Sequence, residues 1–397
     1  MEHSVRWMRL QQKMREQQID GYIATQNVDC YYLSGSMQTG YLFIPAEGEP
    51  VFYVRRSVAR AREESAAAVE ELGAMRTLGE RIRSRYPSLF EQEQVVIATP
   101  WDVLPVQLYR RIEALFPQAA WVDGSVMTRE LRMIKSNEEM EAIREAARVI
   151  DLALEYALAR LYPGMAEFEL IAEIEYAIRR HGHIGIMRMR GYNQEIVTGM
   201  VGAGAAMAKP TYFDGPGGGE GMSPASPQGA GRASIQVGDP ILIDIGCSIG
   251  GYIIDQTRTV VIGELDPELQ AAYDVSEAIL REVEQNLRPG IICEDLYKQA
   301  VIQAEEAGLG EHFMGYGADQ VKFLGHGIGL EIDEFPVLAR GFKYPLEVNM
   351  VIAIEPKFTF PGRGVVGIEN SYRITETGFE KLTQSLEGVR KLAIGRE

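Results

Sequence analysis

The sequence predicts an α+β protein with two domains, and three observations support this prediction. The chain has 397 residues, which is long for a single hydrophobic core. Helical patterns alternate with short apolar runs up to about residue 133, as in an α/β domain. The second half instead contains two similar strand pairs that carry acidic residues. We therefore expect a smaller α/β domain over residues 1–133 and a larger α+β domain over residues 134–397.

The predicted N-terminal domain is built from short apolar runs and helical patterns. The runs expected to form strands are Asp20–Thr25, Tyr41–Pro45, Pro50–Val54 and Gln94–Thr99. The segments expected to form helices are Arg6–Gln17 and Val58–Leu72. Because this domain has no dense cluster of catalytic residue types, we expect the chemistry to lie in the other one.

A capping box marks the expected boundary, although such a box also opens helices inside a single domain. Ser136 and Glu139 have the S-x-x-E spacing in which each side chain accepts a hydrogen bond from a free backbone N–H. Apolar residues then recur at helical spacing and predict a long amphipathic helix that ends near Leu161. A second helix is predicted over Glu167–Arg180.

Composition and charge narrow the class of protein. The 46% of hydrophobic and 24% of charged residues are ordinary for a soluble globular chain. The net charge of -16 argues against nucleic acid or an anionic membrane as the main partner. The three cysteines match no zinc or redox spacing and suit a reducing compartment. Since neither an apolar signal segment nor a run of about 18 apolar residues occurs, we expect a cytoplasmic protein.

Residues 214–232 form a segment rich in glycine, proline and serine. It lacks the G-K-[S/T] ending of a phosphate-binding loop. We expect a long surface loop, and a loop of this length inside a compact domain also allows a second interpretation as a substrate lid.

An internal repeat places acidic residues on apolar strands. Val237–Asp244 resembles Val348–Glu355, and each reads as a turn followed by an apolar strand that ends on a carboxylate. A second carboxylate follows each copy on another apolar strand, Asp255 after the first and Glu369 after the second. We expect one pseudo-symmetric sheet in which the acids meet at the centre. Helices are expected between the copies, at Leu269–Leu287 and Leu296–Ala307.

Four carboxylates and one histidine in this half predict a metal centre. The set comprises Asp244, Asp255, His326, Glu355 and Glu369. Taken singly, each has an ordinary explanation as a solvated strand end, a loop exit or a structural histidine. Together they need a cause, because acids are poor strand residues and repel one another in a low-dielectric pocket. Two divalent cations would balance the four negative charges.

The ligand chemistry narrows the choice of metal and of reaction. Oxygen ligands with one imidazole favour Mn²⁺, Fe²⁺ or Co²⁺ over a thiolate-type zinc site, and zinc remains open. Two such ions, about 3.5–4 Å apart, generate a bridging hydroxide at neutral pH and polarise a carbonyl group. This is chemistry for the hydrolysis of an amide.

These residues resemble the pattern of the pita-bread metallopeptidases, the family that contains methionine aminopeptidase, Xaa-Pro aminopeptidase, prolidase and creatinase. The resemblance runs from about Ser136 to Leu386. The N-terminal portion resembles the creatinase-type N-terminal domain, most recognisably at Asn27–Gly35. The resemblance implies a pita-bread catalytic domain with two divalent metal ions, manganese first among them, and a homodimer.

The resemblance also implies a role for each residue of the set. Asp244 would bind one metal ion and His326 the other, while Asp255 and Glu369 would bridge the two. Glu355 would be both a ligand and the general base that orients the bridging water. The expected catalytic residues are therefore Glu355 and His326.

Several positions depart from the family pattern. Asp333 stands where an H-E-x-P motif usually has a second histidine, and Gly367 stands where an arginine usually precedes the last ligand. The family usually has a further histidine ahead of the first aspartate strand, but Gly199–Pro216 contains none. Asp333 is then either a neutral acid that donates a hydrogen bond or a solvated turn residue. Tyr212 and His183 are candidate replacement donors to the substrate.

We therefore expect a dinuclear metal-dependent hydrolase that cleaves Xaa-Pro or other short peptides, as an aminopeptidase or a dipeptidase, through a metal-bridging hydroxide. The altered positions keep an alternative open: a pita-bread hydrolase or lyase acting on a small non-peptide C–N substrate, as creatinase does. A binding module without catalysis is a third reading, which the complete ligand set disfavours.

Overall fold

The computed structural model describes residues 2–394 and divides into two compact units. One unit comprises Met1–Arg132 with Gly191–Asn193, and the other comprises Met133–Arg190 with Gln194–Glu397. Residues 1 and 395–397, at the outer ends of the two predicted domains, lie outside the described residues. No helix within residues 2–394 is long and apolar enough to cross a membrane.

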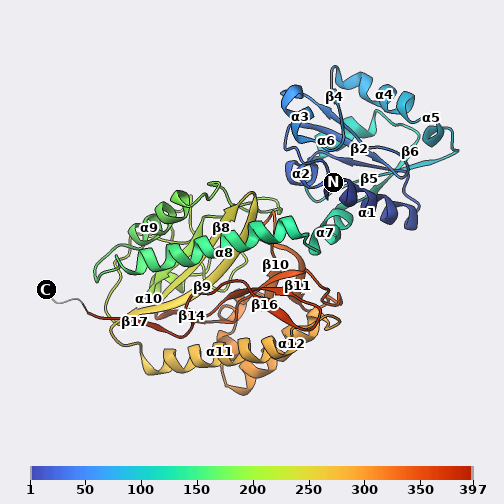
Figure 1. Cartoon of the computed structure of the whole chain (residues 1–397). Coiled ribbons are helices and arrows are strands. Elements are labelled where there is room, and N and C mark those ends of the chain that lie inside the picture. Colours follow the sequence, from blue (N-terminus) through green and yellow to red (C-terminus); the bar gives the residue numbers. More distant parts are fainter. Residues whose placement is uncertain (1, 395–397) are drawn as a thin grey trace. The chain divides into compact units, whose positions relative to one another are not determined.

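The N-terminal unit is built around a six-stranded sheet in the order β4-β3-β2-β1-β5-β6 (Figure 1). Its strands are β1 Gly21–Ala24, β2 Gly40–Pro45, β3 Val51–Val54, β4 Ala68–Glu71, β5 Val95–Thr99 and β6 Ala119–Asp123. Its helices are α1 Glu2–Glu16, α2 Asn27–Ser34, α3 Val58–Glu64, α4 Leu78–Arg85, α5 Pro87–Phe90, α6 Val106–Glu113 and α7 Ser125–Met133, with a 3₁₀ turn at Met75–Thr77. The four predicted strands and the first predicted helix are present within a few residues.

The predicted helix over Val58–Leu72 is wrong in its second half. Helix α3 ends at Glu64, and Ser65 is extended, with φ −83° and ψ 133°. The next residues form β4, which pairs in parallel with β3. The apolar run fits a helix by local preference, but backbone pairing at the edge of the sheet decides its conformation.

The second unit opens with the predicted capping box. The Glu139 N–H donates to Ser136 Oγ at 3.2 Å, and the Ser136 N–H donates to Glu139 Oε2 at 2.7 Å. Helix α8 then runs over Asn137–Leu158, and α9 over Glu167–Arg180, so both predicted helices are confirmed. The remaining helices are α10 Gly204–Met207, α11 Pro267–Asn286 and α12 Cys293–Glu306, with 3₁₀ turns at Gly310–His312 and Gly317–Asp319.

The strands of the second unit form two main sheets and one separate hairpin. The first sheet has the order β17-β9-β8-β7 and the second β11-β10-β12-β15-β16. Their strands are β7 Gly199–Ala203, β8 Ile241–Ile249, β9 Tyr252–Ile262, β17 Arg390–Leu392, β10 Phe323–Gly327, β11 Glu334–Ala339, β12 Val351–Ile354, β15 Asn370–Ile374 and β16 Phe379–Lys381. The hairpin consists of β13 Lys357–Phe360 and β14 Gly364–Gly367.

The predicted repeat is present, but not as one sheet of two equal hairpins. Strands β8 and β9 form a direct hairpin, whereas β12 and β15 pair across the inserted β13–β14 hairpin. An isolated bridge between Thr257 and Glu369 joins the two sheets. The acidic residues therefore meet where two sheets come together, because backbone pairing at this bridge brings the second pair of strands against the first.

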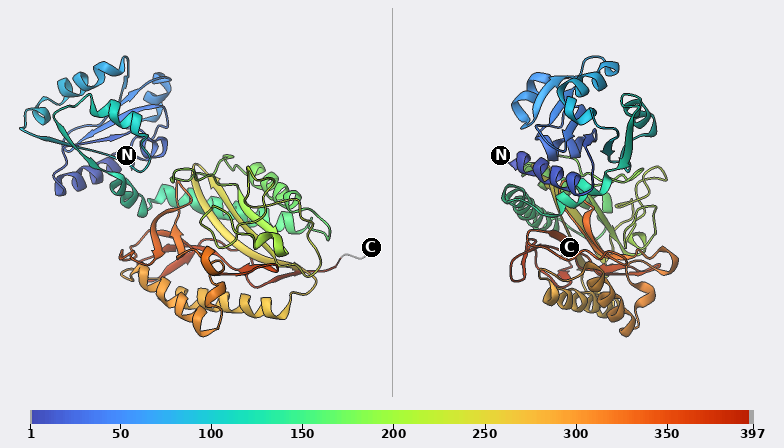
Figure 2. Two further views of the ribbon diagram at one scale, coloured as in Figure 1. Left: turned by 180° about the vertical axis from the view of Figure 1, so that it is seen from behind. Right: turned by 90° about the vertical axis from the view of Figure 1, so that its right-hand side faces the viewer.

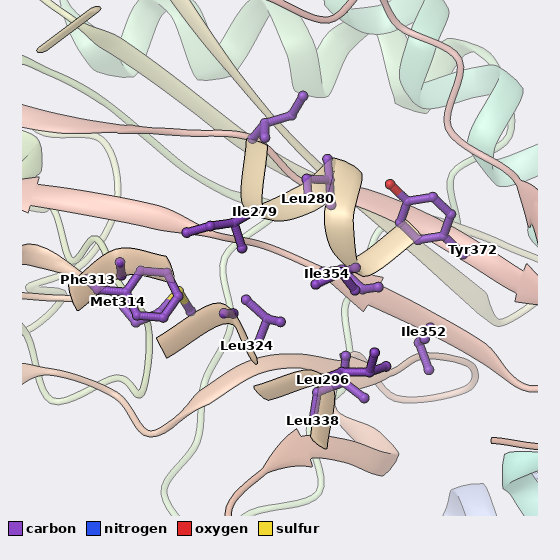
Figure 3. Close-up of a cluster of buried hydrophobic side chains, with 14 of the residues drawn as sticks. Ile279, Leu280, Leu296, Phe313, Met314, Leu324, Leu338, Ile352, Ile354 and Tyr372 are labelled. Atoms are coloured by element: carbon purple, nitrogen blue, oxygen red, sulfur yellow. The ribbon is translucent and has the colours of Figure 1, made fainter. Parts of the chain in front are cut away.

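Helices pack against both sides of these strands. Helix α8 contacts β8 and β9, while α11 contacts β13 and β14 and α12 contacts β10 and β11 (Figures 1 and 2). Between the strands and α11 lies an apolar core in which Ile352, Ile354 and Tyr372 face Ile279 and Leu280 (Figure 3). Each buried aliphatic side chain of this kind contributes about 1.5–3 kcal/mol, so the strands that carry the acids are firmly anchored.

Candidate metal centre

Strand pairing brings the five predicted site residues together. Asp244 lies within β8, not at its end as the sequence suggests, and Asp255 lies on β9. The register pairs Gly246 with Asp255 and Asp244 with Thr257, so the two aspartates are near neighbours on the hairpin. This geometry follows from the period of two in a strand, which directs alternate side chains to one face.

The other three residues come from adjacent strands of the second sheet. His326 lies on β10, Glu355 directly follows β12, and Glu369 directly precedes β15. β12 pairs with both neighbours, so Ile354 lies opposite Gly325 on one side and Asn370 on the other. Glu355, the residue after β12, and Glu369, the residue before β15, therefore lie side by side.

The side chains form two triads that share Glu369. Asp255, His326 and Glu369 form the histidine triad, and Asp244, Glu355 and Glu369 form the carboxylate triad. Within each triad the potential ligand atoms lie within 4.8 Å of one another. The His326 Nε2 atom is also 3.8 Å from Glu355 Oε1, so the triads form one continuous cluster. That these side chains are metal ligands remains a prediction.

Burial makes this cluster electrostatically unusual. Burial, followed by repulsion from Glu369 and Asp244, raises the pKa of Asp255 well above its usual value. Burial also raises the pKa of Asp244 and brings that of Glu355 to about 7, although Lys357 opposes both rises. Carboxylates in this state need a cation nearby to stay ionised at neutral pH.

His326 is oriented by two neighbours. Its Nδ1 atom is 3.1 Å from the backbone oxygen of Gly327 and 3.4 Å from Asp333 Oδ1. Because a carbonyl oxygen can only accept, a proton on Nδ1 is donated to Gly327, and Nε2 then faces the cluster. Burial by itself would lower the pKa of His326, but Asp333, Glu355 and Glu369 outweigh burial and raise it.

A residue that the sequence interpretation missed lies at the centre of the carboxylate triad. The Lys357 side chain is fully buried, and its Nζ donates to Glu355 Oε2 at 2.6 Å, Asp244 Oδ2 at 2.9 Å and Glu369 Oε2 at 3.2 Å. Burial by itself would lower the pKa of Lys357, but these three carboxylates raise it well above its usual value. The spacing carried a signal, since residues two apart in an extended chain share a face and Lys357 follows Glu355 by two.

The histidine triad fits a divalent cation. The Glu369 Oε1 atom is buried and has no hydrogen-bond partner within residues 2–394, whereas Oε2 accepts from Thr257 Oγ1 at 2.7 Å. A buried carboxylate oxygen without a hydrogen-bond partner destabilises the folded state unless a cation binds to it. Two carboxylates and an imidazole are ligands that first-row divalent metals accept.

The three candidate substrate contacts fall in different places. Asp333 lines the cavity beside the cluster, where burial raises its pKa and His326 opposes the rise. Tyr212 is 55% exposed and is not part of the wall of this cavity. His183 is buried elsewhere, and its Nδ1 accepts a hydrogen bond from the Ser248 N–H at 2.9 Å. Burial lowers the pKa of His183, as expected for a neutral structural histidine.

The cavity at the cluster has an acidic wall and an apolar wall. The acidic wall contains Asp214, Asp244, Asp255, Asp333 and Glu355. The apolar wall includes Ile196, Val197, Phe213, Pro216, Phe323 and Ile332. The first residues of the glycine-rich 214–232 segment thus belong to the cavity, and 216–219 are buried, so only part of the predicted surface loop is on the surface. Its interpretation as a lid remains untested.

This combination of fold and cluster defines the class of metal-dependent hydrolases with a two-domain chain. The chain belongs to metallopeptidase family M24, whose family model matches residues 141–376. The model of the creatinase/prolidase N-terminal domain matches residues 6–134. The fold is accordingly the pita-bread fold with a creatinase-like N-terminal domain, and the predicted fold class is confirmed.

Individual relatives agree with this assignment over nearly the whole chain. The Xaa-Pro dipeptidase of Pyrococcus horikoshii is 27% identical over 94% of this chain and 95% of that protein. A probable dipeptidase PepE of Mycobacterium bovis is 30% identical over 90% of this chain and 88% of that protein. The structure of an Xaa-Pro dipeptidase from Bacillus anthracis superposes with a TM-score of 0.82 at 25% identity, covering 98% of this chain and all (100%) of that one.

Proposed function

We propose that this protein is a metal-dependent peptidase that cleaves Xaa-Pro and related short peptides. The observation that carries the proposal is the convergence of Asp244, Asp255, His326, Glu355 and Glu369 in one cluster, of which all but Glu369 line one cavity. The relatives are named as dipeptidases that act on Xaa-Pro bonds, which favours a peptide substrate over the small non-peptide substrate of the creatinase alternative.

The chain's own residues have distinct parts in this reaction. Asp255, His326 and Glu369 would hold a divalent cation, for which we propose Mn²⁺. When bound, this cation lowers the pKa of water and polarises the carbonyl group of the substrate. Glu355 lines the cavity and is positioned to accept a proton from water and return it to the leaving amine. Lys357 holds the Glu355 carboxylate through the 2.6 Å hydrogen bond, and Asp333 orients His326.

The cavity wall favours one kind of peptide. Among the described residues that line it, none is lysine or arginine, whereas five are acidic. Such a wall attracts the free amino group of a peptide and repels a free carboxylate close to the scissile bond. The apolar wall fits a proline ring or an aliphatic side chain. We therefore propose an aminopeptidase preference: Xaa-Pro amides and tripeptides should be better substrates than free Xaa-Pro dipeptides.

A substrate panel tests the function and this preference together. Mn²⁺- or Co²⁺-loaded protein is incubated with Xaa-Pro dipeptides, Xaa-Pro amides and Xaa-Pro-Xaa tripeptides, and product amines are quantified. Turnover of the amides and tripeptides supports the proposal, and faster turnover of the free dipeptides overturns the preference only. If metal analysis confirms loading and no member of the panel is cleaved, the peptidase assignment is wrong.

We also propose that the protein is a homodimer, as the family resemblance implies. Sedimentation at micromolar concentration tests this proposal directly, because a chain of 44.2 kDa and its dimer are well separated in mass. A single species of the monomer mass would contradict it.

A further inference from the structure

The three carboxylates that meet Lys357 are the same residues that form the carboxylate triad. The ammonium group has three hydrogens, and it donates to Asp244, Glu355 and Glu369 over 2.6–3.2 Å. A fully buried ammonium group with three charged acceptors is completely satisfied. The positively charged Lys357 ammonium group therefore lies between three of the predicted metal ligands.

The other triad has no such internal cation. Lys357 contacts only the shared Glu369 in the histidine triad, and does so through Oε2. The second oxygen of that carboxylate, Oε1, is the buried atom that has no partner in the described part of the chain. One side of Glu369 is thus neutralised by the protein, while the other side is left for an external cation.

Gly367 provides the space through which the lysine reaches the cluster. In the β13–β14 hairpin, Gly367 lies directly opposite Lys357. A Cβ atom at position 367 would lie 2.6 Å from Lys357 Cγ and 2.6 Å from the backbone oxygen of Pro356, closer than real contacts allow. The departure at Gly367, where the resemblance leads one to expect arginine, and the buried lysine are therefore two parts of one arrangement.

From these observations we propose that the Lys357 ammonium group takes the place of one of the two metal ions, so that the chain holds a single divalent cation at the histidine triad. The inference deepens the proposed function, because it specifies the cation content of the same site. It is an alternative to the prediction of two divalent metal ions, which membership of the metallopeptidase family supports.

The position of the ammonium group supports a single ion. A second metal ion would need oxygen atoms of Asp244, Glu355 and Glu369 as direct ligands, and the Lys357 ammonium group already fills the space between these atoms. The charge count is compatible with this arrangement, because one divalent cation and the ammonium group leave a single negative charge on the four ionised carboxylates.

The test measures metal content, which does not depend on turnover. Wild-type protein, Lys357→Met and the control Lys343→Met are loaded with Mn²⁺, freed of unbound metal by gel filtration, and analysed for manganese per chain. Methionine keeps the length of the side chain and removes its charge, and Lys343 is exposed. We expect about one equivalent in the wild type and the control, and about two in Lys357→Met, the number of a dinuclear site.

Electron paramagnetic resonance of the loaded wild type gives a second readout that needs no variant. A single Mn²⁺ per chain gives the spectrum of an isolated ion, whereas two ions in adjacent sites give an exchange-coupled spectrum. Two equivalents with such coupling in the wild type, or no tightly bound manganese at all, would overturn the inference. These measurements require no substrate. A failure of the single-ion inference can therefore be distinguished from a failure of the peptidase assignment.

Discussion

The histidine triad and the carboxylate triad share Glu369 and belong to one cluster, yet they are neutralised in different ways. The carboxylate triad surrounds the Lys357 ammonium group, so a positive charge of the chain itself contacts all three acids. The histidine triad contains Asp255, whose raised pKa reflects burial beside other acids, and Glu369 with its unpartnered oxygen. Under the proposal above, the histidine triad holds the divalent cation, and the Lys357 ammonium group takes the place of a second one in the carboxylate triad.

The first prediction has the largest expected effect, and it tests whether the carboxylate triad around Lys357 takes part in catalysis. Glu355→Gln removes the proposed base but keeps the shape of the side chain, and we expect turnover to fall about 10²–10⁴-fold, as for the loss of a general base. Steady-state kinetics on the best peptide substrate measure this change. The exposed Glu306→Gln serves as the control and should match the wild type. Equal activity in the two variants would show that the carboxylate triad is only structural.

The second prediction concerns stabilisation by metal at the histidine triad. Mn²⁺ at 100 times its dissociation constant should stabilise the folded protein by about 2.7 kcal/mol, because it binds the native state alone. Thermal unfolding with and without Mn²⁺ measures the shift. Asp255→Asn removes a proposed ligand and should abolish most of this shift, while the exposed Asp319→Asn should not. A full shift in Asp255→Asn would place the bound cation elsewhere.

The third prediction tests the space beside Lys357. Gly367→Ala puts a Cβ atom against the lysine stem and the Pro356 carbonyl, so we expect a loss of about 1–3 kcal/mol of stability from overpacking. Denaturant unfolding measures it. Gly378→Ala is the matched control, since its nearest neighbour, the Leu287 carbonyl oxygen, is 3.9 Å away. If the two alanine variants are equally stable, Gly367 does not shape the path of the lysine.

The fourth prediction has the smallest expected effect and concerns the stability contributed by Glu387, an acid outside both triads. Burial by itself would raise the pKa of Glu387, but hydrogen bonds and charges from Lys381, Arg281 and Asn370 lower it to about 2. Because the folded-state pKa is depressed, the stabilisation is present above the unfolded pKa of about 4.3 and is lost as the pH falls toward 2.

Removing that carboxylate should therefore reduce stability only where it is ionised. For Glu387→Gln we expect a loss of roughly 1 kcal/mol at pH 7, after allowance for solvent screening, and no difference from the wild type near pH 2. Unfolding titrations at several pH values check the sign. A variant penalty that grows as the pH falls would contradict the assignment of this carboxylate as a satisfied ion pair.

Much of the fold followed from local patterns in the sequence. The Ser136–Glu139 capping box and the apolar spacing behind it specify α8, because both act within one or two turns of a helix. The segment after Glu64 could not be predicted in this way. Strand β4 owes its conformation to pairing with β3, and local sequence preference does not reveal that pairing.

The four acids and the one imidazole side chain of the cluster were recognisable from the sequence by itself, because residue types and spacing carry the chemistry of a ligand set. Which of them are neutralised by the protein was decided only by the tertiary structure. The Lys357 ammonium group reaches three carboxylates, one on β8, one just after β12 and one just before β15, because two sheets meet at the Thr257–Glu369 bridge and Gly367 leaves room for the lysine side chain. Charge balance depends on distances of a few ångströms between segments far apart in the chain, and a linear sequence does not contain those distances.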